Sequence, residues 1–219
     1  MAQLLRIDSS ARLQESHSRR LADEIETAWL TRHPSGRILR RDLAQQPLPH
    51  IIEATIAGYY TPDDQHTKES RVATALSDAL IAELLAADAI LISAPMYNFS
   101  IPSSLKAWID QIVRVNRTFG FDPQKGLFGL LQPKPVYIAS AYGAAGYGDG
   151  GAYAAMNFHE PYLRGLFGFL GLSDVTFFTL EGSSIDPAAL ESTRGRARAV
   201  MARLFAGGTG RKTMEAAIG

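Results

Sequence analysis

The chain of 219 residues contains no cysteine. This absence excludes disulfide bonds, cysteine-ligated zinc, iron–sulfur clusters and a thiol nucleophile, and it is compatible with a reducing cytoplasm. Net charge is also missing, because 22 Lys and Arg residues balance 22 Asp and Glu residues. Nothing in the charge therefore draws the protein to nucleic acid or to an anionic membrane. The five histidines are scattered without a metal-ligand spacing, so we expect no metal site and a small, partly apolar ligand instead.

Long hydrophobic runs are absent as well. No run approaches a membrane span, and the first residues, MAQLLRID, are too short and too charged for the apolar part of a signal peptide. We therefore expect a cytoplasmic protein without membrane contact. Hydrophobic residues still make up 46% of the chain, enough for a sizeable core. No linker divides the sequence, so we predict a single domain over residues 1–205, followed by a flexible tail over 206–219.

Short apolar runs alternate with segments of helical periodicity along this domain. The expected strands are 4–7, 37–42, 89–93, 135–140 and 175–180, and the main helices are expected from about 17 to 32, 67 to 87, 103 to 113, 160 to 170 and 187 to 205. This alternation is typical of an α/β protein with a parallel sheet and helices on both faces. We predict the strand order 2-1-3-4-5, which brings the turns after strands 1, 3 and 4 to one crevice.

Serines surround the predicted start of the first helix. Ser9 and Ser10 follow the first strand, and Ser16 and Ser18 flank His17, with Ser16 or Ser18 as the cap. Unpaired N–H groups and the positive end of the helix dipole favour an anion there, and hydroxyl groups suit a phosphate monoester. The loop contains no glycine, which counts against a dinucleotide fingerprint or a Walker A loop. Capping alone would explain any single serine.

The turn after the third strand, APMYNFSIP at 94–102, is the most informative stretch. Pro95 and Pro102 fix φ, so the residues between them lose few conformations when they bind a ligand. Those residues include Met96, Tyr97, Asn98 and Phe99. Their amides and rings would suit the polar edge and the face of a planar heterocycle such as a flavin. An ordinary strand-to-helix loop with core aromatics is the alternative.

Two further segments carry candidate binding residues. The turn after the fourth strand, 141–151, is rich in glycine, which either lets the backbone approach a ligand closely or forms a flexible connection. The connection at 116–132 contains many apolar residues, with Phe119 and Phe121 alternating as in an extended arm. Such a connection suggests a lid or a subunit contact, and core packing is the alternative for each ring.

The sequence resembles the FMN-dependent NADH:quinone oxidoreductases, also called azoreductases, from about residue 3 to 205. The most specific match is 94–110, and 161–169 and Glu181–Gly182 add support. The resemblance implies a flavodoxin-like, doubly wound, five-stranded parallel sheet with bound FMN and with NADH or NADPH as electron donor. It also implies a homodimer that reduces quinones by two electrons and azo compounds to amines. FMN carries this chemistry, so we name no catalytic residue.

The same resemblance assigns the site residues. FMN phosphate contacts match Ser10, Ser16, His17 and Ser18, and contacts with the isoalloxazine ring match Met96, Tyr97, Asn98 and Phe99. Ser140 and Gly143 match the ends of the family motif Ser-Arg-Gly-Gly, in which Ala141 and Tyr142 stand here for Arg-Gly. The family places aromatic walls of its substrate pocket, partly across a dimer interface, near the positions of Phe119, Phe121 and Phe167.

Three other functions stay open at this point. A flavodoxin-type carrier would bind FMN and rely on a protein partner, but such carriers are usually strongly acidic. An NAD(P)H-dependent FMN reductase is a second alternative. A serine hydrolase could use Ser140, His159 and an aspartate, although the sequence contains no G-x-S-x-G elbow.

Overall fold

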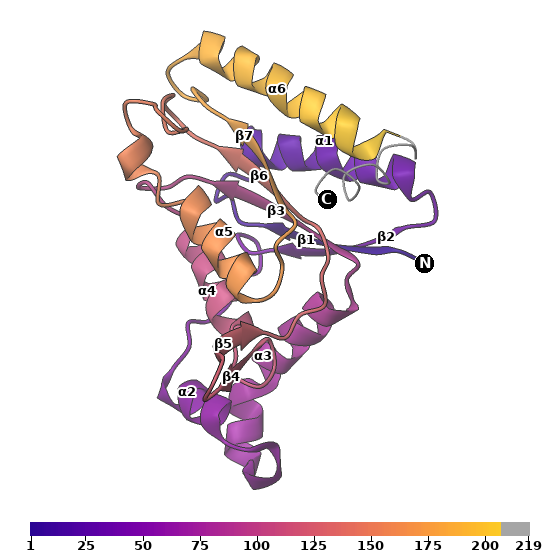
Figure 1. The fold of residues 1–219 in the computed structure, drawn as a ribbon, viewed down its shortest axis with the longest axis vertical. Helices are drawn as coiled ribbons and strands as arrows, with labels where there is room; N and C mark the ends of the chain where they lie inside the picture. The colour runs from indigo at the N-terminus through magenta and orange to yellow at the C-terminus, as the bar shows by residue number, and fades with distance from the viewer. Residues whose placement is uncertain (207–219) are drawn as a thin grey trace.

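The computed structural model describes residues 1–206, and all elements below lie in that range. Its main sheet contains β1 (Gln3–Asp8), β2 (Arg37–Asp42), β3 (Ala89–Pro95), β6 (Val136–Ala141) and β7 (Val175–Leu180) (Figure 1). The strand order is β2-β1-β3-β6-β7, and each neighbouring pair is parallel. Counted along the chain within this sheet, the order is 2-1-3-4-5, so the predicted topology is confirmed. Apart from Ala206, the predicted tail lies outside the described residues.

Helices cover both faces of the sheet. One face carries α1 (His17–Arg32) and α6 (Pro187–Phe205), and the other carries α3 (Lys68–Ala86), α4 (Ser103–Ile112) and α5 (Glu160–Phe169) (Figure 1). The short helix α2 (Glu53–Tyr60) packs against α3. Ser16 caps α1, as predicted, with its Oγ accepting from the Arg19 N–H at 3.4 Å. Gly171, at φ 96°, ends α5 because a left-handed residue stops a helix.

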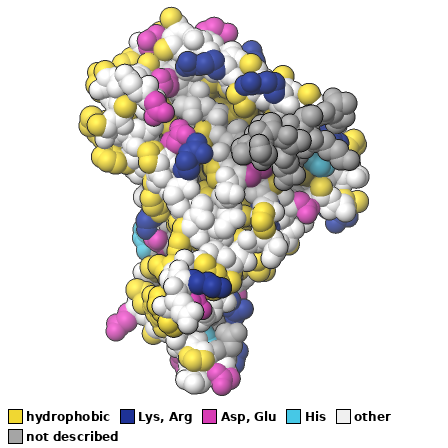
Figure 2. All heavy atoms as spheres, viewed as in Figure 1, with side chains coloured by type: hydrophobic (Ala, Val, Ile, Leu, Met, Phe, Trp, Pro, Cys, Tyr) yellow, Lys and Arg dark blue, Asp and Glu magenta, His cyan; other side chains and the backbone are white. Residues whose placement is uncertain are grey.

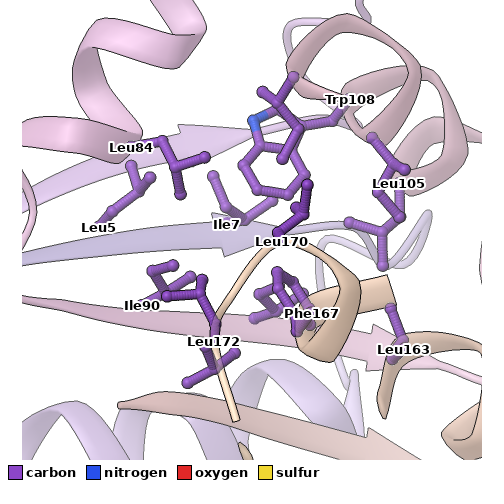
Figure 3. Packing of buried hydrophobic residues seen from close by; sticks show 14 of the residues in the cluster. Leu5, Ile7, Leu84, Ile90, Leu105, Trp108, Leu163, Phe167, Leu170 and Leu172 are labelled. Carbon is purple, nitrogen blue, oxygen red and sulfur yellow. The ribbon is translucent and has the colours of Figure 1, made fainter. Parts of the chain in front are cut away.

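Each face of the sheet has its own hydrophobic core, because successive side chains of a strand point to opposite faces. Leu5 and Ile7 of β1 pack with Trp108 of α4 and Phe167 of α5, as Figure 3 shows. Leu4, from the same strand, packs instead with residues of α1. The central strand β3 is buried along its whole length, and burial of each large apolar side chain contributes about 1.5–3 kcal/mol.

The segment between α4 and β6 forms a separate antiparallel hairpin of β4 (Phe119–Asp122) and β5 (Gly126–Gly129). This hairpin corresponds to the extended arm that the sequence predicts within 116–132. Phe119 packs inward against Phe169, with ring centroids 5.1 Å apart, whereas Phe121 is 63% exposed. Hydrophobic side chains gather on the surface of the lobe that contains the hairpin (Figure 2), and Leu127 and Phe128 are among those exposed.

Candidate functional site

A cavity of about 220 Å³ opens at the carboxyl edge of the sheet. The first loop and α1 contribute Ser10, Arg12, Glu15, Ser16, His17 and Ser18 to its lining; later segments contribute Pro95, Met96, Tyr97, Ala141, Gly143, Ser183 and Ser184. The strand order reverses between β1 and β3, and ligands of open α/β sheets bind at such a point. The turns after the first, third and fourth strands of the sheet therefore meet there, as the topology predicts.

A cluster of buried hydroxyl groups forms the floor of this cavity at the start of α1. The Ser16 Oγ lies 3.0 Å from the Ser10 Oγ and 3.2 Å from the Ser18 Oγ, and the Ser93 hydroxyl donates to the Ser18 Oγ at 3.2 Å. The His17 Nδ1 is buried without a hydrogen-bond partner in the part of the chain that the structure describes. The first N–H groups of a helix also have no partner within the helix. The cluster therefore offers several donors to an anion.

The electrostatics of this cluster do not depend on a charged histidine. Burial lowers the pKa of His17, and the nearby charges of Arg194, Arg20 and Arg12 lower it further. His17 is therefore neutral at pH 7, where its unperturbed pKa would already leave most of it uncharged. The positive potential comes from the α1 dipole and from arginines.

Arg19 holds the serine loop in place. Its Nη2 donates to the Ser10 carbonyl oxygen at 2.8 Å, and its Nη1 donates to the Asp42 carboxylate at 2.6 Å. This pairing raises the pKa of Arg19 and holds the pKa of Asp42 well below its usual range. The charge of Arg19 is thus already balanced by β2, and its role is to position the loop.

The central turn is strained at its tip. Tyr97 and Ser100 exchange backbone hydrogen bonds of 2.9 and 3.1 Å, and Asn98 and Phe99 between them have φ values of 48° and 69°. This is the geometry of a type I′ turn, which Gly and Asn favour and which is unfavourable for a bulky residue such as Phe. Phe99 is nevertheless 38% exposed. Strain of this kind persists only where surrounding contacts maintain it, and it is typical of functional sites.

Other contacts fix the turn to the loops beside it. The Met96 N–H donates to the Ala141 carbonyl oxygen at 3.0 Å, and the Ala11 N–H donates to the Tyr97 hydroxyl oxygen at 3.2 Å. The Phe158 N–H donates to the Phe99 carbonyl oxygen at 3.0 Å. The turn is therefore fixed to the first loop, to β6 and to the segment before α5.

A buried histidine supports the base of the turn. The His159 Nε2 lies 3.0 Å from the Ala94 carbonyl oxygen, so it carries the hydrogen and donates it. Its Nδ1 lies 3.4 Å from the Tyr142 hydroxyl, which donates to it. Burial lowers the pKa of His159 to about 4 and raises the pKa of Tyr142. Both ring nitrogens are occupied, so His159 is not placed to activate Ser140, and the hydrolase alternative loses its base.

The structure distributes the predicted site residues unevenly. Ser10, Ser16, His17, Ser18, Met96, Tyr97 and Gly143 line the cavity. Asn98 and Phe99 lie on the turn beside it, outside the lining. Ser140 is fully buried and, by strand alternation, faces the side of β6 on which Ile138 packs, whereas the cavity-lining Ala141 faces α1 and α6.

None of the three predicted pocket aromatics lines the cavity in this chain. Phe167 is fully buried in the core, Phe119 packs inside the hairpin lobe and Phe121 points outward from it. The structure adds Ser183 and Ser184, which follow β7 at the same edge of the sheet. The sequence carried a signal for these two, because hydroxyl residues follow the last strand as they follow the first.

None of the helices within 1–206 is long and apolar enough to cross a lipid bilayer. Over the same range there is no cluster of three or more His, Cys, Asp or Glu side chains that could hold a metal ion.

The fold and this site define a flavodoxin-like α/β protein, and the family model described as "Flavodoxin-like fold" matches residues 2–204. An FMN-dependent NADH:quinone oxidoreductase of Xanthobacter autotrophicus is 53% identical over 175 residues, which cover 80% of this chain and 84% of the relative. A Trichormus variabilis protein, FMN-dependent NADH:quinone oxidoreductase 2, is 44% identical over 94% of this chain and 99% of its own. The chain therefore belongs to the family of FMN-dependent NADH:quinone oxidoreductases.

Solved structures agree with this fold. The azoreductase from Bacillus anthracis str. Sterne superposes with a TM-score of 0.83 at 24% identity, covering 94% of this chain and 99% of that chain. An FMN-dependent NADH-azoreductase from Bacillus anthracis str. Ames Ancestor, solved in complex with FMN, gives a TM-score of 0.75 at 21% identity, covering 93% of this chain and 99% of that chain.

Proposed function

We propose that this protein is an FMN-dependent oxidoreductase that uses NADH to reduce quinones and azo compounds. One observation carries the proposal beyond family membership. A serine-lined helix start and a strained aromatic turn meet at one cavity, at the point of the sheet where the strand order reverses. The first suits a phosphate group and the second suits a planar ring system, which are the two ends of FMN.

The residues present fit FMN. The hydroxyl groups of Ser10, Ser16 and Ser18, with the unpartnered Nδ1 of His17, would hold the phosphate group. Gly143 lines the cavity and has no side chain, so its backbone would allow close approach of the cofactor; a Cβ there would also crowd the Ser184 Oγ at 3.2 Å.

We assign the ring end of the cofactor to the central turn. Met96, Tyr97, Asn98 and Phe99 would contact the isoalloxazine ring through their amides and side chains. Ser140 does not line the cavity, so it would affect FMN binding only indirectly, from the end of β6 before the glycine-rich loop.

Bound FMN supplies two-electron transfer between a nicotinamide and an acceptor that use the same pocket in turn. The protein binds and orients the reactants and excludes water. The pKa is lowered both in His159, which is buried, and in His17, which is partly buried, so neither is a charged acid in this site near pH 7. The central turn therefore acts through position and hydrogen bonding, and no side chain is proposed as a general acid or base.

We propose a homodimer of single-domain subunits, each formed by residues 1–205 and located in the cytoplasm. The exposed apolar residues of the hairpin support an interface: Phe121, Leu127 and Phe128 would be poorly placed in water. In this arrangement Phe121 would complete the pocket of the partner subunit. Phe119 and Phe167 would support the same wall from within their own subunit.

The test measures NADH oxidation by the FMN-loaded protein with 1,4-benzoquinone and with methyl red. We expect turnover with both acceptors and without any added protein. A flavodoxin-type carrier would bind FMN but would show no such turnover, and an FMN reductase would release reduced FMN into solution. Absence of turnover in a protein that retains FMN would contradict the proposal.

A further inference from the structure

The glycine-rich loop after β6 is an ordered structure in this chain. The N–H groups of Gly146, Tyr147 and Gly148 all donate to the Glu181 carboxylate, at 3.1, 3.1 and 3.2 Å. Three consecutive N–H groups directed at one carboxylate form a nest, which fixes the local backbone. Glu181 follows β7, so the edge strand of the sheet anchors the loop.

The rest of the loop folds back on this anchor. The Tyr153 N–H donates to the Gly146 carbonyl oxygen at 2.9 Å, and the Asn157 side chain donates to the Tyr147 carbonyl oxygen at 3.2 Å. A Cβ at Gly151 would lie 2.3 Å from the Gly146 carbonyl oxygen, so only glycine fits there. Gly151 thus serves close packing of the loop, and Gly146 and Gly150 supply positive φ values of 95° and 75°.

This packing places one ring at the centre of an aromatic cluster. The Tyr147 ring lies 5.6 Å from the Tyr142 ring, 5.6 Å from the Tyr153 ring and 6.5 Å from the Phe99 ring, measured between centroids. Tyr142 is buried on His159, whereas Phe99 and Tyr153 are 38% and 48% exposed. The exposed rings of the central turn and of the loop are therefore joined through Tyr147.

We propose that this loop is an aromatic extension of the acceptor site that favours acceptors with more than one ring, with Tyr147 as the residue that determines specificity. A single-ring quinone is contacted by the central turn alone. A fused two-ring quinone or a diaryl azo compound reaches the Phe99–Tyr147–Tyr153 surface as well. Glu181 is a positioning residue, because it acts on the acceptor only through the backbone of the loop. The proposal rests on the proposed function and names the substrate class of the same site.

The test compares 2-methyl-1,4-naphthoquinone with 1,4-benzoquinone in the FMN-loaded protein. The absence of cysteine removes alkylation of thiols by quinones as a complication. Tyr147→Leu keeps an apolar side chain without the ring, and Tyr147→Phe is the matched control that keeps the ring. We expect Tyr147→Leu to raise the KM for the naphthoquinone roughly 2- to 12-fold, the value of one aromatic contact, with little change in kcat. The KM for benzoquinone and all constants of Tyr147→Phe should stay near the wild-type values.

Glu181→Gln should produce the same selective rise in KM, because an amide has a single oxygen to accept the three N–H groups. Binding of the naphthoquinone without NADH, measured by equilibrium dialysis, gives a readout that does not depend on turnover. Its Kd should rise in Tyr147→Leu and in Glu181→Gln. Equal changes for both quinones, or none for either, would overturn the proposal. Reduction of ferricyanide by NADH needs bound FMN but no stacked acceptor. It therefore distinguishes failure of this loop proposal, in which ferricyanide is still reduced, from failure of the proposed function, in which it is not.

Discussion

His159 makes the stability of the protein sensitive to acid. Its side chain is fully buried between the Ala94 carbonyl oxygen and the Tyr142 hydroxyl, and burial lowers its pKa from 6.5 to about 4. In the unfolded chain the pKa returns to about 6.5. Between these two values the unfolded state binds more protons than the folded state, so the free energy of unfolding falls as the pH falls.

The size of the effect follows from the two pKa values. The contribution of His159 is nearly complete at pH 7, and about 2 kcal/mol of it is lost at pH 5 and about 3 kcal/mol at pH 4. For a domain of this size, a loss of about 2 kcal/mol corresponds to a fall in Tm of roughly 4–8 °C. A change of this kind is easily measured.

The assay is urea unfolding from pH 7 to pH 4, with wild type and His159→Gln both free of FMN so that cofactor binding does not contribute. Glutamine keeps a donor for the Ala94 carbonyl oxygen but does not titrate. Between pH 7 and pH 4 we expect the free energy of unfolding of the variant to fall by about 3 kcal/mol less than that of the wild type. His50→Gln is the matched control, because the His50 side chain is exposed. If His159→Gln kept the wild-type slope over this range, the buried neutral histidine would be refuted.

Three further substitutions test other parts of the structure. Lys134→Met should lower the free energy of unfolding by about 1–2 kcal/mol in urea unfolding, because the ammonium donates to three main-chain carbonyl groups at the end of α3. Arg19→Gln should weaken FMN binding roughly tenfold in a fluorescence titration, because it frees the Ser10 carbonyl from its link to Asp42. Phe99→Gly should leave Tm unchanged or slightly higher by relieving backbone strain, yet lower kcat/KM for quinones more than about tenfold; unchanged quinone kinetics would remove the turn from the site.

Local sequence signals were sufficient for the fold. The apolar runs at Leu4–Ile7 and 89–93 are strands because parallel strands are buried on both faces, and Ser16 and Thr67 begin helices because their hydroxyl groups cap free N–H groups. The convergence of three turns then follows from topology alone, since the strand order puts their carboxyl ends at one edge.

The parts that could not be predicted depend on pairs of residues far apart in the sequence. Arg6 lies inside a buried strand because Asp8 and Glu26 neutralise it, and the pairing with Glu26 across 20 positions leaves no local pattern. The clamp of Glu181 on the glycine loop spans 33 to 35 positions. Ser140 illustrates a different limit: a shift of one residue in a strand changes the face that a side chain occupies.

FMN binding at the serine-lined start of α1 is tested most directly by the amount of cofactor that the protein retains. The protein is loaded with FMN and desalted, and the bound cofactor is quantified by its visible spectrum and identified by mass. We expect about one FMN per chain in the wild type and in the exposed control Ser192→Ala, and a large loss in the double variant Ser16→Ala/Ser18→Ala. No retained FMN in the wild type, or full retention in the double variant, would contradict the assignment of this site.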